Sequence, residues 1–317
     1  MCLSKGYEMR NIKETLVIIG NGFDIFHGIR SSYWDFKRYL EENREHRFID
    51  ALESYISSDE LWCSFEYALG CLDFDAVKES NSCYLLGYGD DNWRDSAHHD
   101  YQMMISEELQ FAKDIPKYLR EWILSLETRK EQKISDNVLN SNNTYISFNY
   151  TDTLEQTYDI PRNKILYVHG KASESGQLIV GHGNSAMTIN KTPSEFATED
   201  EKEAYIEYME SIDIREQEAE EIIRGYFVAT YKNVDEIIRY YYSFFMGLQG
   251  IKKVYVLGHS LADVDLPYFA LINQILGQDI TWVVTYYKDY EREEFMFQLQ
   301  KCGIKWKQIM TCKMEQL

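Results

Sequence analysis

The sequence has few prolines, no paired cysteine motif and no long apolar run, and each absence removes a class of protein. The four prolines are scattered and no Gly/Ser-rich linker interrupts the chain, which argues against two domains on a flexible connector. The six cysteines include no CxxC pair and no Cys/His cluster, so we expect neither a metal site nor a disulfide framework. They are predicted to be free thiols of a cytoplasmic protein.

Membrane-spanning and basic segments are missing as well. No apolar run approaches the ~20 residues that span a bilayer, and the N-terminus lacks the apolar core of a signal peptide. The 33 lysines and arginines face 52 aspartates and glutamates, which gives a formal net charge of −19. No dense Lys/Arg run offsets this charge. We therefore predict a cytoplasmic protein that binds neither nucleic acid nor an anionic membrane.

What is present points to one α/β fold with large insertions. Across 317 residues, 44% are hydrophobic, which is enough for a substantial core. The apolar run at 15–19 stops at the glycine turn 20–22, and further strand patterns alternate with helix patterns in the last third of the chain. Such alternation indicates crossover connections. The predicted fold class is a Rossmann-like, doubly wound parallel sheet, with strands at 15–19, 143–148, 164–168, 177–180, 253–257, 280–286 and 304–309.

Two helical insertions divide the predicted sheet in sequence. The nucleotide-binding α/β core comprises residues 14–32, 140–192 and 250–312. Residues 33–139 form a helical insertion, with one long helical stretch at 97–127 that is expected to kink at Pro116. Residues 193–249 form an acidic helical insertion, which has twelve acidic and two basic residues between positions 193 and 222. That run is typical of a solvated helical face, and it would also suit self-association or a partner protein.

Polar and glycine residues follow four of the predicted strands. Ligands of doubly wound sheets bind beyond the carboxyl ends of the strands, so these segments predict a nucleotide site. The glycine turn is a weak signal by itself, because the dinucleotide fingerprint needs a glycine where Ile25 stands. Asp24 would either cap the next helix or contact a ribose hydroxyl. The predicted ligand-binding residues are Gly20, Asn21, Gly22, Phe23, Asp24, Asp152, Gly258 and Ser260.

Two strand-end residues are candidates for catalysis. The amide of Asn149 offers a donor and an acceptor, which would hold a water or a ribose hydroxyl in a fixed orientation. His169 precedes Gly170 and carries the side chain best suited to general-base work near neutral pH. His182, in VGHG, is a second histidine candidate. Each of these residues also has a purely structural interpretation as a turn or core residue.

The motifs GNGFDIFHG, LWCSFE, SFNYTDTLE, YVHG, IVGHG and VLGHSLADVDLPYF, in this order, resemble the bacteriophage abortive-infection AbiH family. The similarity extends over most of the chain and implies a bacterial protein that stops the growth of an infected cell. A more distant resemblance is to the sirtuin fold, including NAD-hydrolysing defence effectors. It rests on the glycine turn at 20–22, Asn149, the His169–Gly170 pair and the segment 258–260.

The sirtuin-like resemblance implies NAD as substrate or ligand and no metal, because the chain lacks the four-cysteine zinc ribbon of sirtuin deacetylases. Asn149 and His169 would be the catalytic pair, and Gly20, Asn21, Gly22 and Ser260 would hold NAD. The implied activity is hydrolysis of the nicotinamide–ribose bond. One alternative is a non-catalytic nucleotide sensor or interaction protein of a defence system. The other is a serine hydrolase that uses Ser260, although no histidine follows His259 in the chain.

Overall fold

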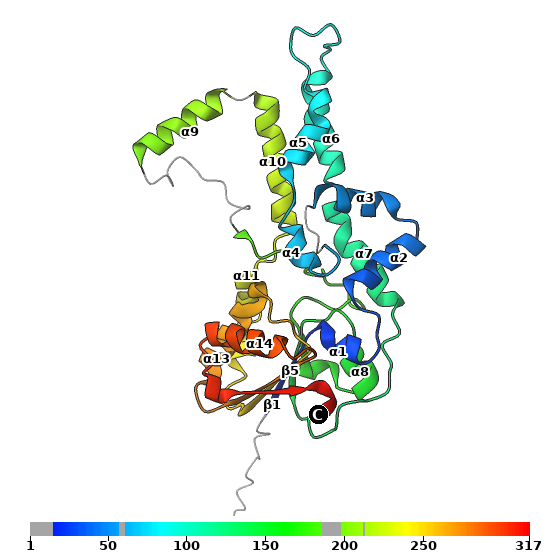
Figure 1. Cartoon of the computed structure of the whole chain (residues 1–317), viewed down its shortest axis with the longest axis vertical. Helices are drawn as coiled ribbons and strands as arrows, with labels where there is room; N and C mark the ends of the chain where they lie inside the picture. Colours follow the sequence, from blue (N-terminus) through cyan, green and yellow to red (C-terminus); the bar gives the residue numbers. More distant parts are fainter. Residues whose placement is uncertain (1–14, 57–60, 186–197, 212) are drawn as a thin grey trace, which may run out of the picture. The chain divides into compact units, whose positions relative to one another are not determined.

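The computed structural model describes residues 15–56, 61–185, 198–211 and 213–317 (Figure 1). Several predicted features fall partly outside these ranges. Residues 1–14 and 186–192, of which 14 and 186–192 belong to the predicted core, lie outside the described ranges. So do residues 57–60 of the first insertion and residues 193–197 and 212 of the acidic insertion.

The chain contains a six-stranded sheet in which every pair of neighbours is parallel. The strand order is β3-β2-β1-β4-β5-β6, which is the order of doubly wound dinucleotide-binding folds. This confirms the predicted α/β class. The strands are β1 (Thr15–Ile19), β2 (Thr144–Ser147), β3 (Ile165–Tyr167), β4 (Lys253–Leu257), β5 (Thr281–Tyr286) and β6 (Ile309–Lys313).

Strand β1 lies between β2 and β4, and Ile18 pairs in register with Ile146 on one side and Val256 on the other. Its apolar run is buried on both faces, as expected where helices cover both sides of a parallel sheet. Full burial of each such side chain stabilises the fold by roughly 1.5–3 kcal/mol. The order reverses between β1 and β4, so loops that leave their carboxyl ends meet at the topological switch point of the sheet.

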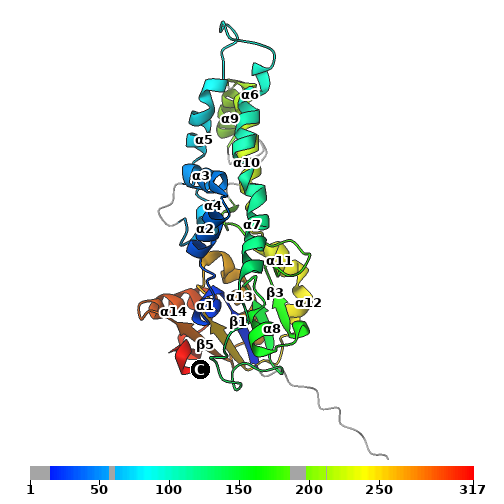
Figure 2. The same ribbon diagram turned by 90° about the vertical axis from the view of Figure 1, so that its right-hand side faces the viewer.

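Helices and loops pack on both faces of the sheet. On one face, Val17 and Ile19 belong to a core cluster with Phe23 of α1 and Leu154 of α8. On the other face, Phe269 of α13 lies against Trp282 of β5, with 6.3 Å between ring centroids. The helices that belong entirely to this unit are α1 (Asn21–Phe26), α8 (Thr153–Tyr158), α11 (Val234–Tyr240), α12 (Tyr242–Met246), α13 (Leu266–Leu276) and α14 (Glu291–Lys301) (Figures 1 and 2).

His27, just after α1, ties two parts of this core together. Its Nδ1–H donates to the carbonyl of Phe23 at 2.8 Å, and its Nε2 accepts from the Tyr158 hydroxyl at 2.6 Å. The Tyr158 oxygen in turn accepts backbone N–H groups of Lys133 and Ile134, each at 3.1 Å. Burial lowers the pKa of His27, which favours the neutral imidazole.

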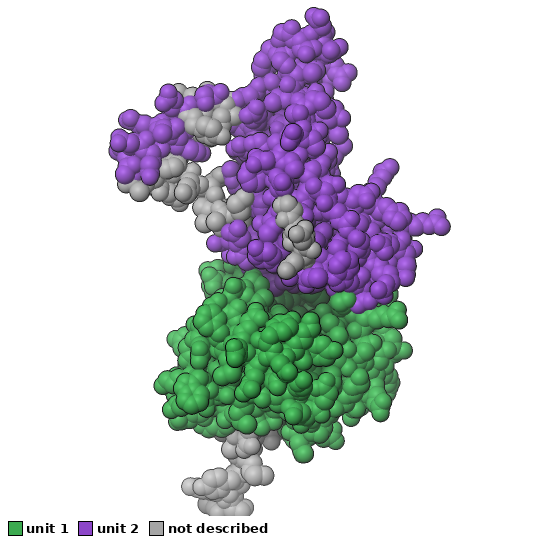
Figure 3. All heavy atoms as spheres, viewed as in Figure 1, with its two compact units in different colours: residues 1–32, 120–178, 233–317 green, residues 33–119, 179–232 purple. Residues whose placement is uncertain are grey.

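A second compact unit is helical (Figure 3). It comprises residues 33–119 and 179–232, whereas residues 1–32, 120–178 and 233–317 form the sheet unit. Its helices are α2 (Tyr33–Glu42), α3 (His46–Tyr55), α4 (Phe65–Leu69), α5 (Phe74–Asn81), α6 (Ala97–Glu108), most of α7 (Phe111–Ser125), α9 (Glu199–Ser211) and α10 (Ile214–Ala229). These boundaries differ from those drawn on the sequence, because residues 120–139 and 233–249 cluster with the sheet.

Three local predictions were wrong. Residues 177–180 form no strand, since their apolar side chains are buried in an irregular loop. The last strand is β6 at Ile309–Lys313 rather than 304–309, because η6 (Trp306–Gln308) precedes it. The stretch 97–127 breaks between Glu108 and Phe111, whereas Pro116 lies inside α7. Within the described ranges, no helix is long and apolar enough to cross a membrane.

Candidate functional site

The glycine turn after β1 packs directly against the loop after β4. The N–H of Gly20 donates to the carbonyl of Leu257 at 3.1 Å, and that of Gly22 donates to the carbonyl of Gly258 at 2.8 Å. A Cβ on Gly20 would lie 2.6 Å from the Cα of His259. Gly258 has φ +62°, and a Cβ there would lie 2.2 Å from the backbone nitrogen of Phe23. These glycines are therefore required for contact between the two loops.

Three backbone N–H groups of this turn are already bonded within the protein. The N–H of Phe23 donates to the carbonyl of Gly20 at 2.9 Å, and the N–H groups of Gly20 and Gly22 are bonded as described above. The Phe23 ring lies in the core, 4.5 Å from His27 between centroids. The amide of Asn21 donates to the carbonyl of Ser31 at 2.7 Å. These contacts fix the loop, and binding of NAD by its residues stays a prediction.

Asp24 lies beside this turn and is fully buried. Its Oδ2 accepts the hydroxyl of Thr151 at 2.6 Å. Desolvation raises the pKa of Asp24 to about 6, while nearby groups, first the hydroxyls of Thr151 and Thr153 and then the Asn149 amide, oppose that rise. The Asp24 carboxyl thus joins the end of β1 to the segment that follows β2. It is not a helix cap, since Gly20 occupies the N-cap position of α1.

Asn149 follows β2 and is 5% exposed. Its amide is close enough to Asp24 to lower the pKa of that carboxyl, yet it lacks the distance and angle of a hydrogen bond. Within the part of the chain that the structure describes, neither amide atom of Asn149 nor Oδ1 of Asp24 has a hydrogen-bond partner. Buried polar atoms are rarely left so, and each of these can bond to a ligand or to water.

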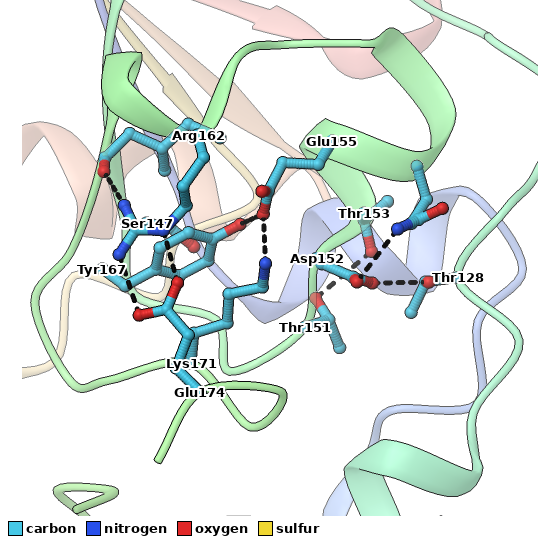
Figure 4. Close-up of polar contacts among 12 residues, drawn as sticks. Thr128, Ser147, Thr151, Asp152, Thr153, Glu155, Arg162, Tyr167, Lys171 and Glu174 are labelled. Carbon is cyan, nitrogen blue, oxygen red and sulfur yellow. Dashed lines mark hydrogen bonds and ion pairs between the residues drawn. The ribbon is translucent and has the colours of Figure 1, made fainter. Parts of the chain in front are cut away.

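Asp152, also predicted to bind ligand, contacts other residues. Its Oδ1 accepts the hydroxyl of Thr128 at 2.7 Å, and Oδ2 accepts the amide of Gln156 at 3.2 Å (Figure 4). Its charge still reaches Asp24, whose pKa it helps to raise. Figure 4 also shows the neighbouring edge of the sheet, where Glu155 accepts from the Tyr167 hydroxyl and pairs with Lys171, each at 2.7 Å.

His169 follows β3 and is 2% exposed. Its ring lies 5.2 Å from that of Phe148 and 6.4 Å from that of Tyr150, the two neighbours of Asn149 in sequence. Its Nε2 lies 3.8 Å from Oδ1 of Asp265. The structure therefore brings His169 to the segment that carries Asn149. The specific contacts of the two side chains differ, because Asn149 lies near Asp24 and His169 near Asp265.

Among the predicted ligand-binding residues are Gly258 and Ser260, on either side of His259, but neither His259 nor Asp265. His259 is 4% exposed, and its Nε2 lies 3.7 Å from Oδ2 of Asp265. Ser260 is exposed. The spacing of His259 and Asp265 within GHSLADVD was the available signal, since polar residues in a segment that follows a buried strand meet other strand ends.

The geometry around Ser260 is not that of a nucleophile elbow. Such an elbow places the serine on a tight turn that leads directly into a helix. Here the non-glycine residue with positive φ is Leu261, at +53°, and α13 begins only at Leu266. The serine-hydrolase alternative therefore gains no support.

His182 belongs to the helical unit. Its Nδ1 accepts the N–H of Asn184 at 3.1 Å, and its Nε2 donates to the carbonyl of Phe227 at 3.2 Å. Burial lowers the pKa of His182, and a Cβ on Gly70 would lie only 2.9 Å from the His182 Cβ. These contacts give His182 a packing role in that unit.

Within the described ranges, no group of three His, Cys, Asp or Glu side chains is placed to hold a metal ion. The cysteines at positions 63, 71, 83, 302 and 312 are free thiols.

The fold and this edge define a class of protein. The parallel sheet, with its strands in the order of dinucleotide-binding folds and buried polar side chains beyond its carboxyl ends, places the protein in the doubly wound α/β class. The chain matches the family model described as "Bacteriophage abortive infection AbiH" over residues 16–286. Because the match covers most of the chain, the protein belongs to the AbiH family, and this membership indicates a role in abortive infection by bacteriophage.

No curated protein and no solved structure matches the chain. The family resemblance deduced from the motifs is confirmed. The more distant sirtuin-like relationship stays a prediction.

Proposed function

We propose that this protein is an antiphage effector that hydrolyses NAD at the nicotinamide–ribose bond. The observation that carries the proposal is the buried pair of Asp24 and Asn149 beyond β1 and β2, with three polar atoms that lack hydrogen-bond partners within the described residues. A carboxylate oxygen and an amide are suited to the hydroxyl groups of a ribose, which both donate and accept. The strand order adds support, since it is that of dinucleotide-binding sheets.

The proposed reaction needs little from the protein beyond orientation and one base. The bond between the nicotinamide nitrogen and the ribose anomeric carbon breaks, and nicotinamide leaves with the bonding electron pair. A water oxygen bonds to the anomeric carbon, and a proton of that water passes to His169. The second product is ADP-ribose. Asn149 orients that water or a ribose hydroxyl. A general base of this kind contributes ~10²–10⁴-fold to the rate.

Nicotinamide release by the purified full-length protein tests the activity. We expect Asn149→Ala and His169→Ala to release nicotinamide about 100-fold or more slowly than wild type. Asn142→Ala is the matched control, because Asn142 is exposed. Wild-type turnover with no loss in either site variant would refute the assignment of residues.

A toxic effector is expected to stay inactive until infection, so the same variants are compared in infected cells. We expect the NAD content to fall with wild type and with Asn142→Ala, and to be preserved with His169→Ala. The sensor alternative predicts a different result. In that case NAD would bind to the purified protein, as measured by calorimetry, while cellular NAD would stay constant with every variant.

A further inference from the structure

Two histidines approach one carboxylate beyond the carboxyl ends of β3 and β4. Nε2 of His169 lies 3.8 Å from Oδ1 of Asp265, and Nε2 of His259 lies 3.7 Å from Oδ2. The two histidine side chains are each 3% exposed and that of Asp265 is 10% exposed. The Phe148 ring packs edge-on against both imidazoles, with centroids 5.2 Å and 4.3 Å away. Three chain segments therefore fix this cluster in a largely dry environment.

The backbone selects the tautomer of His259. The N–H of Leu261 donates to Nδ1 of His259 at 2.9 Å, so the proton of the neutral ring is on Nε2 and faces Asp265. Leu261 has φ +53° and is fully buried. The left-handed conformation is unfavourable for a residue with a side chain. Such strain persists where the surroundings impose it, and it collects at functional sites.

This arrangement has consequences for Asp265 and His169. Nδ1 of His259 already accepts the Leu261 N–H, so the ring presents its Nε2–H toward Asp265. A ring N–H in this position is complementary to a carboxylate oxygen. The carboxylate in turn favours the tautomer of His169 with its proton on Nε2, and a proton that His169 then accepts enters at Nδ1.

We propose that Asp265 and His259 are a positioning pair for His169, in which Asp265 orients the His169 ring and stabilises its imidazolium. This inference rests on the proposed function, since it assigns the pair to the base of the same reaction. Among the residues that the structure describes, the titratable groups near His169 include Asp265, the phenols of Tyr150 and Tyr268, and His259 beyond Asp265.

The pH dependence of Asp265→Asn tests the positioning role. Removal of the carboxylate is expected to lower kcat about tenfold or more, with little change in KM. The acidic limb of the kcat profile should move to lower pH, because the imidazolium loses its counter-charge. Asp263→Asn is the matched control, since its side chain is 76% exposed and lies two residues away. An Asp265→Asn profile that superimposes on wild type would overturn the proposal.

A second measurement does not depend on turnover. The histidine ring nitrogens of the full chain are labelled with ¹⁵N, and the His169 signals are assigned by their loss in His169→Gln. Their titration midpoint should fall by about one pH unit or more in Asp265→Asn and stay constant in Asp263→Asn. A constant midpoint in both variants refutes the positioning role. A shifted midpoint, together with cellular NAD that stays constant on infection, refutes the NAD reaction but leaves the interaction intact.

The contribution of His259 is tested by two substitutions. Gln retains a side-chain N–H that can reach Asp265, whereas Leu removes every donor. The kcat of His259→Gln should therefore be closer to the wild-type value than that of His259→Leu. The titration midpoint of His169 should also be closer to wild type in His259→Gln than in His259→Leu. Equal losses in the two variants would show that His259 acts through packing alone and would refute its place in the pair.

Discussion

Replacement of Asp24 by asparagine is expected to stabilise the protein at neutral pH. Asp24 is fully buried, and desolvation raises its pKa from 3.8 to about 6. The folded protein therefore binds a proton at Asp24 more tightly than the unfolded chain does. The stabilising effect of this proton is complete below pH 3.8 and is lost as the pH rises through 6. Ionised Asp24 is thus a destabilising feature at pH 7.

The magnitude follows from the shift. A pKa that rises by about two units on folding adds about 3 kcal/mol to the free energy of unfolding. This contribution is present at low pH and is lost above pH 6. Between pH 5 and pH 8 the loss is about 1 kcal/mol, because part of it has already occurred at pH 5. The amide introduced by Asp24→Asn would carry no charge and can still accept the Thr151 hydroxyl. The stability of Asp24→Asn relative to wild type should therefore grow by that amount over this interval.

Urea denaturation followed by circular dichroism at pH 5, 6, 7 and 8 measures the difference. Asp136→Asn is the control, because Asp136 is exposed in the same unit. The difference in unfolding free energy between Asp136→Asn and wild type should not grow from pH 5 to pH 8. A difference between Asp24→Asn and wild type that is constant from pH 5 to pH 8 would refute the reasoning, since it would mean that Asp24 ionises alike in both states.

Three further predictions concern stability and are read from thermal or urea unfolding. The side chain of Lys232 is 1% exposed and pairs with Glu66. Glu66→Gln should therefore lower the free energy of unfolding by about 3 kcal/mol, and replacement of both residues by Met should restore part of that stability. If Glu66→Gln loses no more stability than the double Met variant, this prediction is contradicted. Gly258→Ala should yield little soluble protein, because its Cβ would overlap the loop after β1 at a φ of +62°; a normal melting temperature would argue against the close contact. Tyr158→Phe should cost about 2 kcal/mol or more, because His27 and two backbone N–H groups lose their partner, and an unchanged unfolding midpoint would contradict the described network.

The strands were predicted best where an apolar, β-branched run ends at a residue that stops a strand. β1 and β4 were placed at their observed limits, since each is an apolar, β-branched run that stops at a glycine. Residues 177–180 have a similar composition, but Leu178 and Val180 are buried by packing in a loop and not by strand pairing. A short apolar run does not show whether a segment is a strand or a buried loop, because burial in either structure favours the same apolar residue types.

The candidate site was predictable as a set of segments and not as a set of contacts. Parallel topology brings the ends of β1, β2, β3 and β4 to one edge, which the alternation of strands and helices indicated. Which side chains meet there depends on depth and orientation. The burial of Asp24, its bond to Thr151 and the approach of His259 to Asp265 depend on how the segments pack in three dimensions, so no local pattern reveals them.

The backbone contact between the loops after β1 and β4 has a mechanical consequence. With Gly22 bonded to Gly258 and no side chain between them, the two loops cannot slide independently without breaking that bond or opening a void. A displacement imposed at Asp24 on one loop is thus passed to His259 on the other through peptide units alone. If the proposed ligand occupies the carboxyl end of β1, this backbone contact would transmit a movement there to the imidazole cluster.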